Sequence, residues 1–331
     1  MRSLLDPPPR SAIARFDPAF GQRFLLTVDT EEEFDWSKPF TREGHGLDHV
    51  RRLEKFQQFC ENEGVVPVYL VDWPIVQSAR AAEILRGPVA AGKAEIGIQL
   101  HPWVNPPFEE ELTSHNSFAG NLPRDLERAK FRGLRDAVEQ TFEAAPAIYR
   151  AGRYGVGPST AAMLAEGGIA IDSSVRANFD YSAEEGPDFR HHPLVPYWLD
   201  DARTLLELPL TTVFWGMLRR QGPWLFPKLA ALGTLRAVLA RAGLLERIAL
   251  TPEGVTVDEA IRGIDIALDD GLPLLVLSFH SPSLQAKHTP YVRDEDDLDT
   301  LYDWWRRVLA YLELRGVEPT TVAGIMQAVR R

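Results

Sequence analysis

One stretch indicates the fold class of this chain: Phe24-Leu25-Leu26-Thr27-Val28-Asp29-Thr30-Glu31-Glu32-Glu33. The apolar run from Phe24 to Val28 contains β-branched residues and no helix-breaking residue, which is typical of a buried parallel strand. An unpaired carboxylate beside a core is costly, so acidic residues directly after such a strand indicate a site. In an α/β barrel the carboxyl ends of all strands meet at one face, where catalytic groups lie.

Further apolar runs also end on chemically useful residues. Between them, apolar residues recur at helical spacing, as in the segments from Leu47 to Cys60, Arg124 to Phe142 and Thr256 to Asp269. The alternation predicts an α/β protein with a single (β/α)7 barrel, closed or slightly open. The six further expected strands are Val65 to Val71, Glu95 to Leu100, Ala147 to Arg150, Ile169 to Ile171, Leu205 to Leu208 and Pro273 to Phe279.

The barrel is expected to fill residues 21–331, after an N-terminal extension over residues 1–20 that holds three successive prolines. Residues 216–250 interrupt the alternation and predict a helical insertion. The insertion is basic, and two interpretations are open: a solvated helical face, or a lid or docking face for an acidic partner or membrane surface. Its six basic residues are Arg219, Arg220, Lys228, Arg236, Arg241 and Arg247, against Glu246 alone.

Composition excludes several classes of protein. The 331 residues are 45% hydrophobic and 25% charged, which is ordinary for a globular protein. A net charge of −11 argues against a nucleic-acid partner. No apolar run approaches the ~20 residues of a membrane helix or resembles a signal peptide. Cys60 is the only cysteine, which excludes disulfides and cysteine metal sites. We therefore expect a cytoplasmic protein; the sequence carries no signal for its oligomeric state.

The strand ends supply the groups that a divalent metal and an acid–base pair require. Each group also has a structural alternative. Asp72 is the type of residue that caps the next helix, and this is its favoured interpretation. His101 before Pro102 suits a turn, and Arg150 suits a structural salt bridge. The strand-end residues are Asp29, Glu31, Asp72, His101, Arg150, Asp172 and His280.

Four of these segments resemble, in order, the motifs of the polysaccharide deacetylases, the NodB-homology carbohydrate esterases. Thr27-Val28-Asp29-Thr30-Glu31 resembles the first motif and Glu95-Ile96-Gly97-Ile98-Gln99-Leu100-His101-Pro102-Trp103 the second. Tyr149-Arg150-Ala151-Gly152-Arg153-Tyr154-Gly155 resembles the third, and Leu277-Ser278-Phe279-His280-Ser281-Pro282 the last.

The resemblance covers residues 24–283 and implies a NodB-type barrel with a metal-assisted hydrolase site. It implies that Asp29 is the general base, that Arg150 pairs with this base, and that His280 is the general acid. It also implies that Glu31 and His101 bind a divalent metal, with zinc the expected ion.

The motifs depart from the family pattern at the metal ligands. The second acid of the first motif usually follows the base directly, but Thr30 stands there and Glu31 follows it. The two histidines of the second motif align with Gln99 and Trp103, and His101 is shifted by two residues. Gln99 and His101 would share one side of an extended segment, so His101 could still reach the site.

Aromatic and further polar residues near strand ends are candidates for binding the substrate, because aromatic rings offer apolar area beside polar groups. The alternative is that the rings only cover the top of the barrel. Among the other histidines, most are expected on the surface or in loops, and His115, His191 and His192 are candidates to replace a missing ligand. The substrate-binding candidates are Trp36, Trp73, Trp103, Tyr154 and Asp172.

Three functions remain open at this stage. The favoured one is a hydrolase that removes an acyl group from a saccharide, at an amide or an ester. The second is a carbohydrate-binding or regulatory protein on the same barrel without turnover. The third is an amide hydrolase, independent of metal, that acts on a small non-sugar substrate. Fold-level analogy does not distinguish them.

Overall fold

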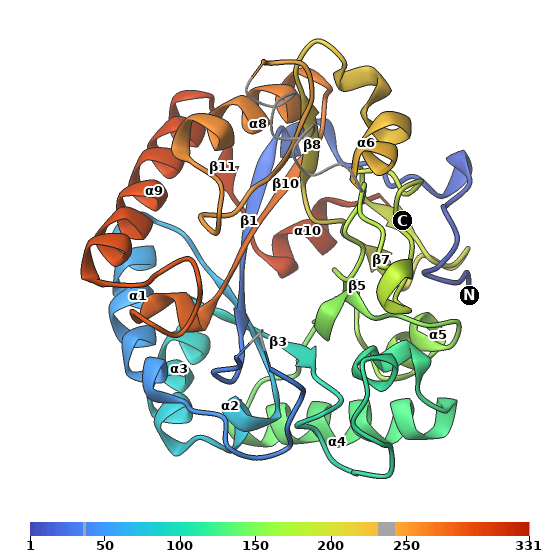
Figure 1. Cartoon of the computed structure of the whole chain (residues 1–331), viewed down its shortest axis with the longest axis vertical. Helices are drawn as coiled ribbons and strands as arrows, with labels where there is room; N and C mark the ends of the chain where they lie inside the picture. The colour runs from blue at the N-terminus through green and yellow to red at the C-terminus, as the bar shows by residue number, and fades with distance from the viewer. Residues whose placement is uncertain (36–37, 231–241, 331) are drawn as a thin grey trace.

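A curled sheet of nine strands forms the centre of the computed structural model, which describes residues 1–35, 38–230 and 242–330 (Figure 1). Seven of its strands make up the parallel barrel, and the short β11 (Glu318–Pro319) pairs with the start of β1. The strand order is β10-β1-β2-β3-β4-β5-β7, and the predicted α/β barrel is confirmed. The strands are β1 (Arg23–Thr30), β2 (Val68–Val71), β3 (Glu95–Leu100), β4 (Ile148–Ala151), β5 (Ile171–Asp172), β7 (Leu206–Glu207) and β10 (Leu274–His280).

Alternate residues of each strand face the inside and the outside of the barrel. Leu25 of β1 joins the interior apolar cluster, and Leu26 joins the cluster under the helices. The interior is narrow at Gly97 of β3, where an added Cβ would lie 2.6 Å from the Leu70 side chain and 2.8 Å from the Ile148 carbonyl oxygen. Both faces of the sheet are therefore buried, which explains the near-continuous apolar runs of the sequence.

Helices cover the outside of the barrel, as the 3.6-residue periodicity predicts. Figure 1 shows α9, α1 and α3 along one side of the sheet. Neighbouring helices touch each other, α1 with α3, α3 with α4, and α8 with α9. The helices are α1 (Leu53–Asn62), α2 (Trp73–Gln77), α3 (Ala79–Ala90), α4 (Arg124–Phe142), α5 (Thr160–Glu166), α6 (Gly222–Ala230), α8 (Val257–Asp269), α9 (Glu295–Leu314) and α10 (Val322–Ala328).

The last helix, α10, closes the end of the barrel where the strands begin. Val322 and Ile325 join the interior apolar cluster. The backbone N–H groups of Val322 and Ala323 donate to the carboxylate of Glu95, the first residue of β3, at 2.6 and 3.2 Å. The opposite end, where the strands finish, is left for a cavity.

A two-stranded antiparallel unit lies beside the edge of β10. It pairs β8 (Thr212–Trp215) with β9 (Glu246–Ala249) and forms a separate sheet from the barrel. Hydrogen bonds from β10 to the flanking residues hold it there: Ser278 N–H to the Leu250 carbonyl at 3.1 Å and Val276 N–H to Thr211 Oγ1 at 2.9 Å. The stretch 216–250 is therefore not helical throughout: it holds α6 and β9, and residues 231–241 lie outside the described part.

Three basic side chains of this stretch contact the molecule itself, whereas Arg220 is exposed. Arg219 forms an ion pair with Asp270 at 3.0 Å, and Arg247 donates to the Asn178 carbonyl at 2.9 Å. Lys228 lies 3.7 Å from the centre of the Trp224 ring. Because these three side chains are engaged within the molecule itself, they favour the first interpretation over a docking face for an acidic partner or membrane. Two of the others, Arg236 and Arg241, lie outside the described residues.

The N-terminal segment, residues 1–20, packs against the barrel. Leu4 is fully buried, and Ile13 forms a bridge to Tyr197. Tyr197 belongs to β6 (Tyr197–Trp198), which runs antiparallel to β7.

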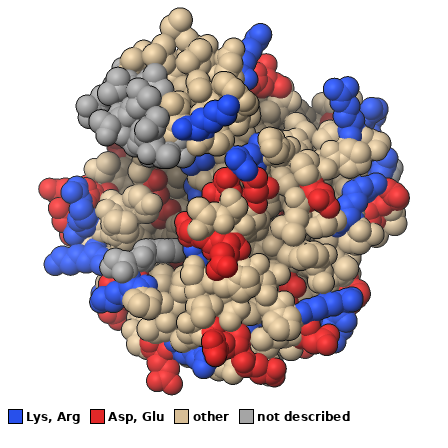
Figure 2. Space-filling model, turned by 45° about the vertical axis from the view of Figure 1, so that its right-hand side comes forward, with Lys and Arg blue, Asp and Glu red and all other residues tan. Residues whose placement is uncertain are grey.

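Charge is mixed over the molecular surface. Figure 2 shows Lys and Arg side chains scattered among Asp and Glu side chains on one face. In the described part of the chain, no helix has both the length and the apolar character needed to cross a membrane.

Candidate active site

A cavity of about 340 Å³ opens at the carboxyl ends of the strands. The topology brings to it five residues that are far apart in the sequence: Asp29, Glu31, His101, Arg150 and His280. The strand register places two of them side by side, because Asp29 of β1 is directly opposite His280 of β10. Of the seven strand-end residues, these five line the cavity, whereas Asp72 and Asp172 do not.

Asp29 is held by Arg150 in the wall of the cavity. The two form a buried ion pair between Arg150 Nη1 and Asp29 Oδ1. The remaining guanidinium donors are also bonded, from Nε to the Ser173 carbonyl at 2.9 Å and from Nη2 to Thr27 Oγ1 at 3.1 Å. Arg150 is only 1% exposed, so this network fixes the carboxylate of Asp29 in one orientation.

His280 is held by Glu253, which lies in the loop between β9 and α8. His280 Nδ1 is 2.6 Å from Glu253 Oε2, and the His280 backbone N–H donates to Oε1 of the same carboxylate at 3.2 Å. Nε2 lies 3.8 Å from Asp29 Oδ2. Burial alone would lower the pKa of His280, but Glu253, Glu31 and Asp29 outweigh it and raise the pKa to about 10. His280 is therefore an imidazolium at neutral pH.

His101 stands between two carboxylates, with one ring nitrogen for each. Nδ1 is 2.9 Å from Glu32 Oε2, and Nε2 is 3.5 Å from Glu31 Oε2. The Trp103 ring stacks on the imidazole and donates its Nε1–H to Glu32 Oε1 at 2.7 Å. An Nδ1–H bonded to a carboxylate fixes the ring and directs Nε2 at the cavity, as is usual for a histidine that binds metal.

The position of the His101 ring requires a glycine at residue 152, directly after the neighbouring strand β4. A Cβ added to Gly152 would lie 2.3 Å from the His101 ring and 2.7 Å from the Leu100 carbonyl oxygen. The backbone after β4 thus approaches the imidazole as closely as a residue without a side chain permits.

Glu31 is a buried carboxylate with other carboxylates nearby, so a bound cation would stabilise its ionised form. Burial, with smaller contributions from Glu32 and Asp29, raises the pKa of Glu31 to about 7, although His280 and His101 act against it. Gln99 donates to Glu31 Oε2 at 3.0 Å, while its own Oε1 is buried and has no hydrogen-bond partner within the described chain.

Two groups of side chains could hold a divalent ion, and they share His101. The first is Glu32, Asp72 and His101, whose donor atoms lie within 4.8 Å of one another. The second consists of Glu31 and His101, whose Oε2 and Nε2 atoms lie 3.5 Å apart, together with Gln99, which lines the same cavity.

The cavity-facing group fits a catalytic ion better. In the first group, Glu32 already accepts from Trp103 and contacts His101, and Asp72 accepts from Ile75 N–H and Glu32 N–H at 2.9 and 2.8 Å. Neither Glu32 nor Asp72 lines the cavity. Asp72 instead caps α2, as the sequence favoured. Glu31, Gln99 and His101 all line the cavity, and their oxygen and nitrogen donors suit a divalent ion.

A second buried network ties the loop after β1 to the end of β10. His49 is fully buried; its Nδ1 is 2.9 Å from Glu33 Oε1 and its Nε2 is 2.8 Å from Ser281 Oγ. The Glu31 backbone N–H donates to the same hydroxyl at 3.3 Å. Burial lowers the pKa of His49, so the neutral ring accepts a hydrogen bond from the Ser281 hydroxyl at Nε2 and donates one from Nδ1 to Glu33. The network positions the backbone of Glu31.

The predicted substrate-binding residues divide into three groups. Tyr154 lines the cavity, and Trp36 lies outside the described residues. Trp73, Trp103 and Asp172 do not line the cavity, which corrects the expectation for these three. Trp103 is 1% exposed and supports His101 from behind.

The orientation of Asp172 follows from strand alternation. Asp172 is in register with Tyr149, which faces the outer cluster, whereas Ile171 faces the interior. Its carboxylate therefore points away from the cavity and bonds Ser174 Oγ at 2.7 Å.

None of the histidines considered as replacement ligands reaches the cavity. His115 is half exposed and lies 3.5 Å from Glu185, and His192 bonds the Leu4 carbonyl at 3.1 Å. Like His191, they are absent from the cavity lining. His49, expected at the surface or in a loop, is instead part of the buried network.

Sequence reasoning missed Glu253, Glu32, Gln99 as an oxygen donor, and Arg176. Glu32 could have been found, because it stands in the acidic cluster after β1. Glu253 follows no predicted strand, and Arg176 lies beyond the polar residues that end the predicted strand from Ile169 to Ile171, so neither residue carries a local signal.

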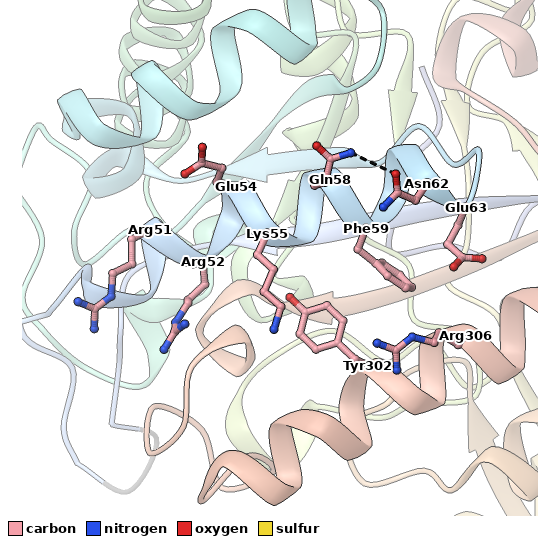
Figure 3. Close-up of a pocket in the computed structure, with 10 residues that line it drawn as sticks. All are labelled: Arg51, Arg52, Glu54, Lys55, Gln58, Phe59, Asn62, Glu63, Tyr302 and Arg306. Atoms are coloured by element: carbon pink, nitrogen blue, oxygen red, sulfur yellow. Dashed lines mark hydrogen bonds between the residues drawn. The ribbon is translucent and has the colours of Figure 1, made fainter.

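A wider groove of about 980 Å³ lies elsewhere, between α1 and α9 (Figure 3). Arg51, Arg52, Lys55 and Arg306 line it, with Phe59 and Tyr302 between them. None of the strand-end residues lines this groove, so the smaller cavity is the candidate active site.

Comparison with solved structures supports the fold. The chain is similar to Puue allantoinase with a TM-score of 0.51 and 13% identity, over 94% of this chain and 91% of that one. It is also similar to a Mycobacterium smegmatis protein assigned as a polysaccharide deacetylase (TM-score 0.49, 16% identity, 96% and 98% coverage). A third is the Bc1960 peptidoglycan N-acetylglucosamine deacetylase (TM-score 0.46, 12% identity, 96% and 92% coverage).

No family model and no curated protein sequence matches the chain. The allantoinase likeness shows a shared barrel; at 13% identity it shows the fold alone.

Proposed function

We propose that this chain is a divergent member of the polysaccharide-deacetylase family, a hydrolase that removes an acyl group from a saccharide, at an amide nitrogen or an ester oxygen. One observation carries the proposal. Asp29 and His280 stand in register on adjoining strands, each held by its own partner of opposite charge, and both line one cavity. A base and an acid a few ångströms apart are what hydrolysis of an amide requires.

In this mechanism Asp29 is the general base. It accepts a proton from water as the water oxygen forms a bond to the acyl carbon. Arg150 keeps the carboxylate ionised and oriented toward the cavity. General-base steps of this kind contribute roughly 10²–10⁴-fold.

His280 is the general acid. Its imidazolium donates the Nε2 proton to the amine nitrogen as the carbon–nitrogen bond breaks. Glu253 holds the ring through Nδ1 and keeps it protonated, since it is the nearest negative charge.

Glu31, His101 and Gln99 would hold the divalent ion, for which we propose zinc. Such an ion, when bound, supplies Lewis acidity that lowers the pKa of water and polarises a carbonyl. Glu32 and Trp103 orient His101 for this role.

An amide hydrolase acting on a small non-sugar substrate is the second candidate. The volume of the cavity favours it, because about 340 Å³ lies at the small end of ligand sites. Among the described residues, the phenol rings of Tyr154, Tyr181 and Tyr291 line it, whereas the expected Trp73 and Trp103 do not. A carbohydrate-binding protein without turnover is the remaining alternative.

Release of free amine from acetylated amino-sugar oligomers tests the proposal, with zinc, manganese or cobalt added to the purified protein. We expect turnover that falls at least about 10²-fold in Asp29→Asn. The matched control is Asp201→Asn, an exposed carboxylate in a surface ion pair, which should keep wild-type activity. Binding of the sugars without amine release, with every ion, would favour the binding-protein alternative.

Metal content of the same preparations distinguishes the two candidate ion positions. We expect about one ion per chain in the wild type and in Asp72→Asn, and loss of the ion in Glu31→Gln. The reverse pattern would place the ion at Glu32, Asp72 and His101.

A further inference from the structure

Three arginines line the cavity, and they differ in how their charge is balanced. Arg150 is paired with Asp29 and Arg153 with Glu184. In the described part of the chain, no carboxylate lies within ion-pair distance of Arg176, the third arginine.

Arg176 is nevertheless held in place. It stands in the loop after β5, where its guanidinium donates to the Tyr181 hydroxyl at 3.1 Å. The guanidinium carbon lies 3.8 Å from the centre of the Phe179 ring and 5.1 Å from that of Tyr154. Stacking on aromatic faces fixes the plane of the guanidinium without neutralising its charge.

Arg176 is also close to the proposed acid. It lines, together with His280, Glu253 and Tyr291, a side pocket of about 90 Å³ that adjoins the main cavity. A ligand whose scissile bond faces His280 can therefore reach Arg176 with another part of the same molecule.

A half-buried guanidinium with no anionic partner among the described residues is suited to an anion that the ligand brings. The planar fork of arginine matches the two oxygens of a carboxylate, and charge-assisted bonds of this type are about twice as strong as neutral ones. A neutral saccharide would leave the Arg176 charge unmatched.

We propose that the substrate of this site carries a carboxylate, bound by Arg176 beside the reacting amide. The inference rests on the proposed function for the position of the scissile bond. It defines the substrate class as acylated amines that bear an acid group, such as an N-acyl amino sugar acid or an N-acyl amino acid.

Calorimetric binding of matched probe pairs tests the proposal without requiring turnover. One pair is N-acetylglucosaminuronic acid and N-acetylglucosamine; the other is N-acetyl-β-alanine and its amide. For at least one pair we expect the acid to bind about tenfold more tightly than its neutral partner, because hydrogen bonds to charged groups are strong.

In Arg176→Gln the preference for the acid should fall to about twofold or less, with the affinity for the neutral probe unchanged, which also shows that the variant is folded. Arg176→Lys, which keeps the charge and loses the fork, should retain part of the preference. Arg306→Gln removes an exposed positive charge from the groove of Figure 3 and is the matched control.

The proposal is wrong if neither acid binds more tightly than its neutral partner, or if Arg176→Gln keeps the preference. These outcomes are separate from those of the proposed function. Release of amine from neutral sugars, unaffected by Arg176→Gln, would leave the hydrolase and remove the acid-specific substrate. Tighter binding of the acids without any release of amine would support the carboxylate site at Arg176 and contradict the hydrolase.

Discussion

Glu253 and His280 form the pair on which the acid step of the proposed reaction depends. The carboxylate is the largest of the contributions that raise the pKa of His280, and it is bonded to the ring at Nδ1. This contribution does not require Glu31 to be ionised, so it persists when a cation neutralises Glu31. The proton that His280 would donate is therefore controlled by a residue that does not itself line the main cavity.

Replacing Glu253 by Gln should lower the pKa of His280 by about one unit or more, because a neutral amide no longer favours the imidazolium. An acid is active below its pKa, so the basic limb of the pH–rate profile should move to lower pH. Two-dimensional NMR of the histidine rings measures the same pKa directly, whether or not the protein turns over.

Glu184→Gln is the control for this experiment, since Glu184 lines the cavity but pairs with Arg153. Its His280 titration should match that of the wild type. An unchanged His280 pKa in Glu253→Gln would show that Glu253 does not set the protonation of the acid.

At this scale, sequence reasoning succeeded where a residue stands at the end of a buried strand on the inward side. Asp29, Glu31, His101, Arg150 and His280 all satisfy that condition. Asp172 was misplaced because a single position along a strand reverses the direction of the side chain, and the register of β5 is not visible in its sequence.

At the scale of elements, the Ser281 hydroxyl joins the loop after β1 to the end of β10. It accepts from the Glu31 N–H and contacts His49 Nε2, and all of these groups are buried. Ser281 follows His280 directly. Its hydrogen bond with the Glu31 N–H therefore fixes the backbone of Glu31, the proposed metal ligand, relative to that of His280, the proposed acid.

Ser281→Ala should lower the free energy of unfolding by about 1–3 kcal/mol, because the variant leaves a buried N–H and a buried ring nitrogen without partners. Urea unfolding measures the change. Thr300→Ala on α9 removes an exposed hydroxyl that bonds only its own helix and should cost less than about 0.5 kcal/mol. Equal values for the two variants would contradict the positioning role of the network.

The alternation of strands and helices is visible in the sequence, but the β8–β9 unit is not. Its second strand, β9, lies inside the stretch that reads as a helical insertion, and β9 carries two charged residues, Glu246 and Arg247, within four residues. Pairing with β8 gives this segment its extended form, and the partner is distant in sequence.

At the scale of the whole molecule, binding of a divalent ion should raise the free energy of unfolding by a measurable amount. A ligand that binds only the folded state at 100 times its dissociation constant adds about 2.7 kcal/mol. Zinc in excess should therefore raise the melting temperature of the wild type above that in chelator, by about 2 °C or more for a chain of this size. The Glu31→Gln variant should show no such shift, and a response equal to that of the wild type would place the ion elsewhere.

The pH dependence of the chelated protein provides an independent test. The pKa of Glu31 is raised from 4.5 to about 7 in the folded protein, so folding favours its protonated form. This contribution to the free energy of unfolding is fully present below pH 4.5. It decreases by about 3 kcal/mol as the pH rises to about 7. Relative to Glu31→Gln, the chelated wild type should lose stability over this interval, and zinc should restore it. Parallel pH curves for the two proteins would show that Glu31 is not desolvated.

The sequence by itself determined the barrel and the face of the barrel that carries chemistry. Buried parallel strands need apolar residues on both faces, so the polar residue that ends each run is visible without knowing any partner. It also placed Asp29, Glu31, His101, Arg150 and His280 at this face.

Only the tertiary structure decided which partners these residues have. Glu253 reaches His280 from a loop beside the β8–β9 unit, and Glu32 and Trp103 orient His101. Arg176 lines the cavity, and no carboxylate of the described chain lies within ion-pair distance of it. Hydrogen bonds and charge balance depend on distances between segments that the chain brings together only on folding. No local pattern encodes them.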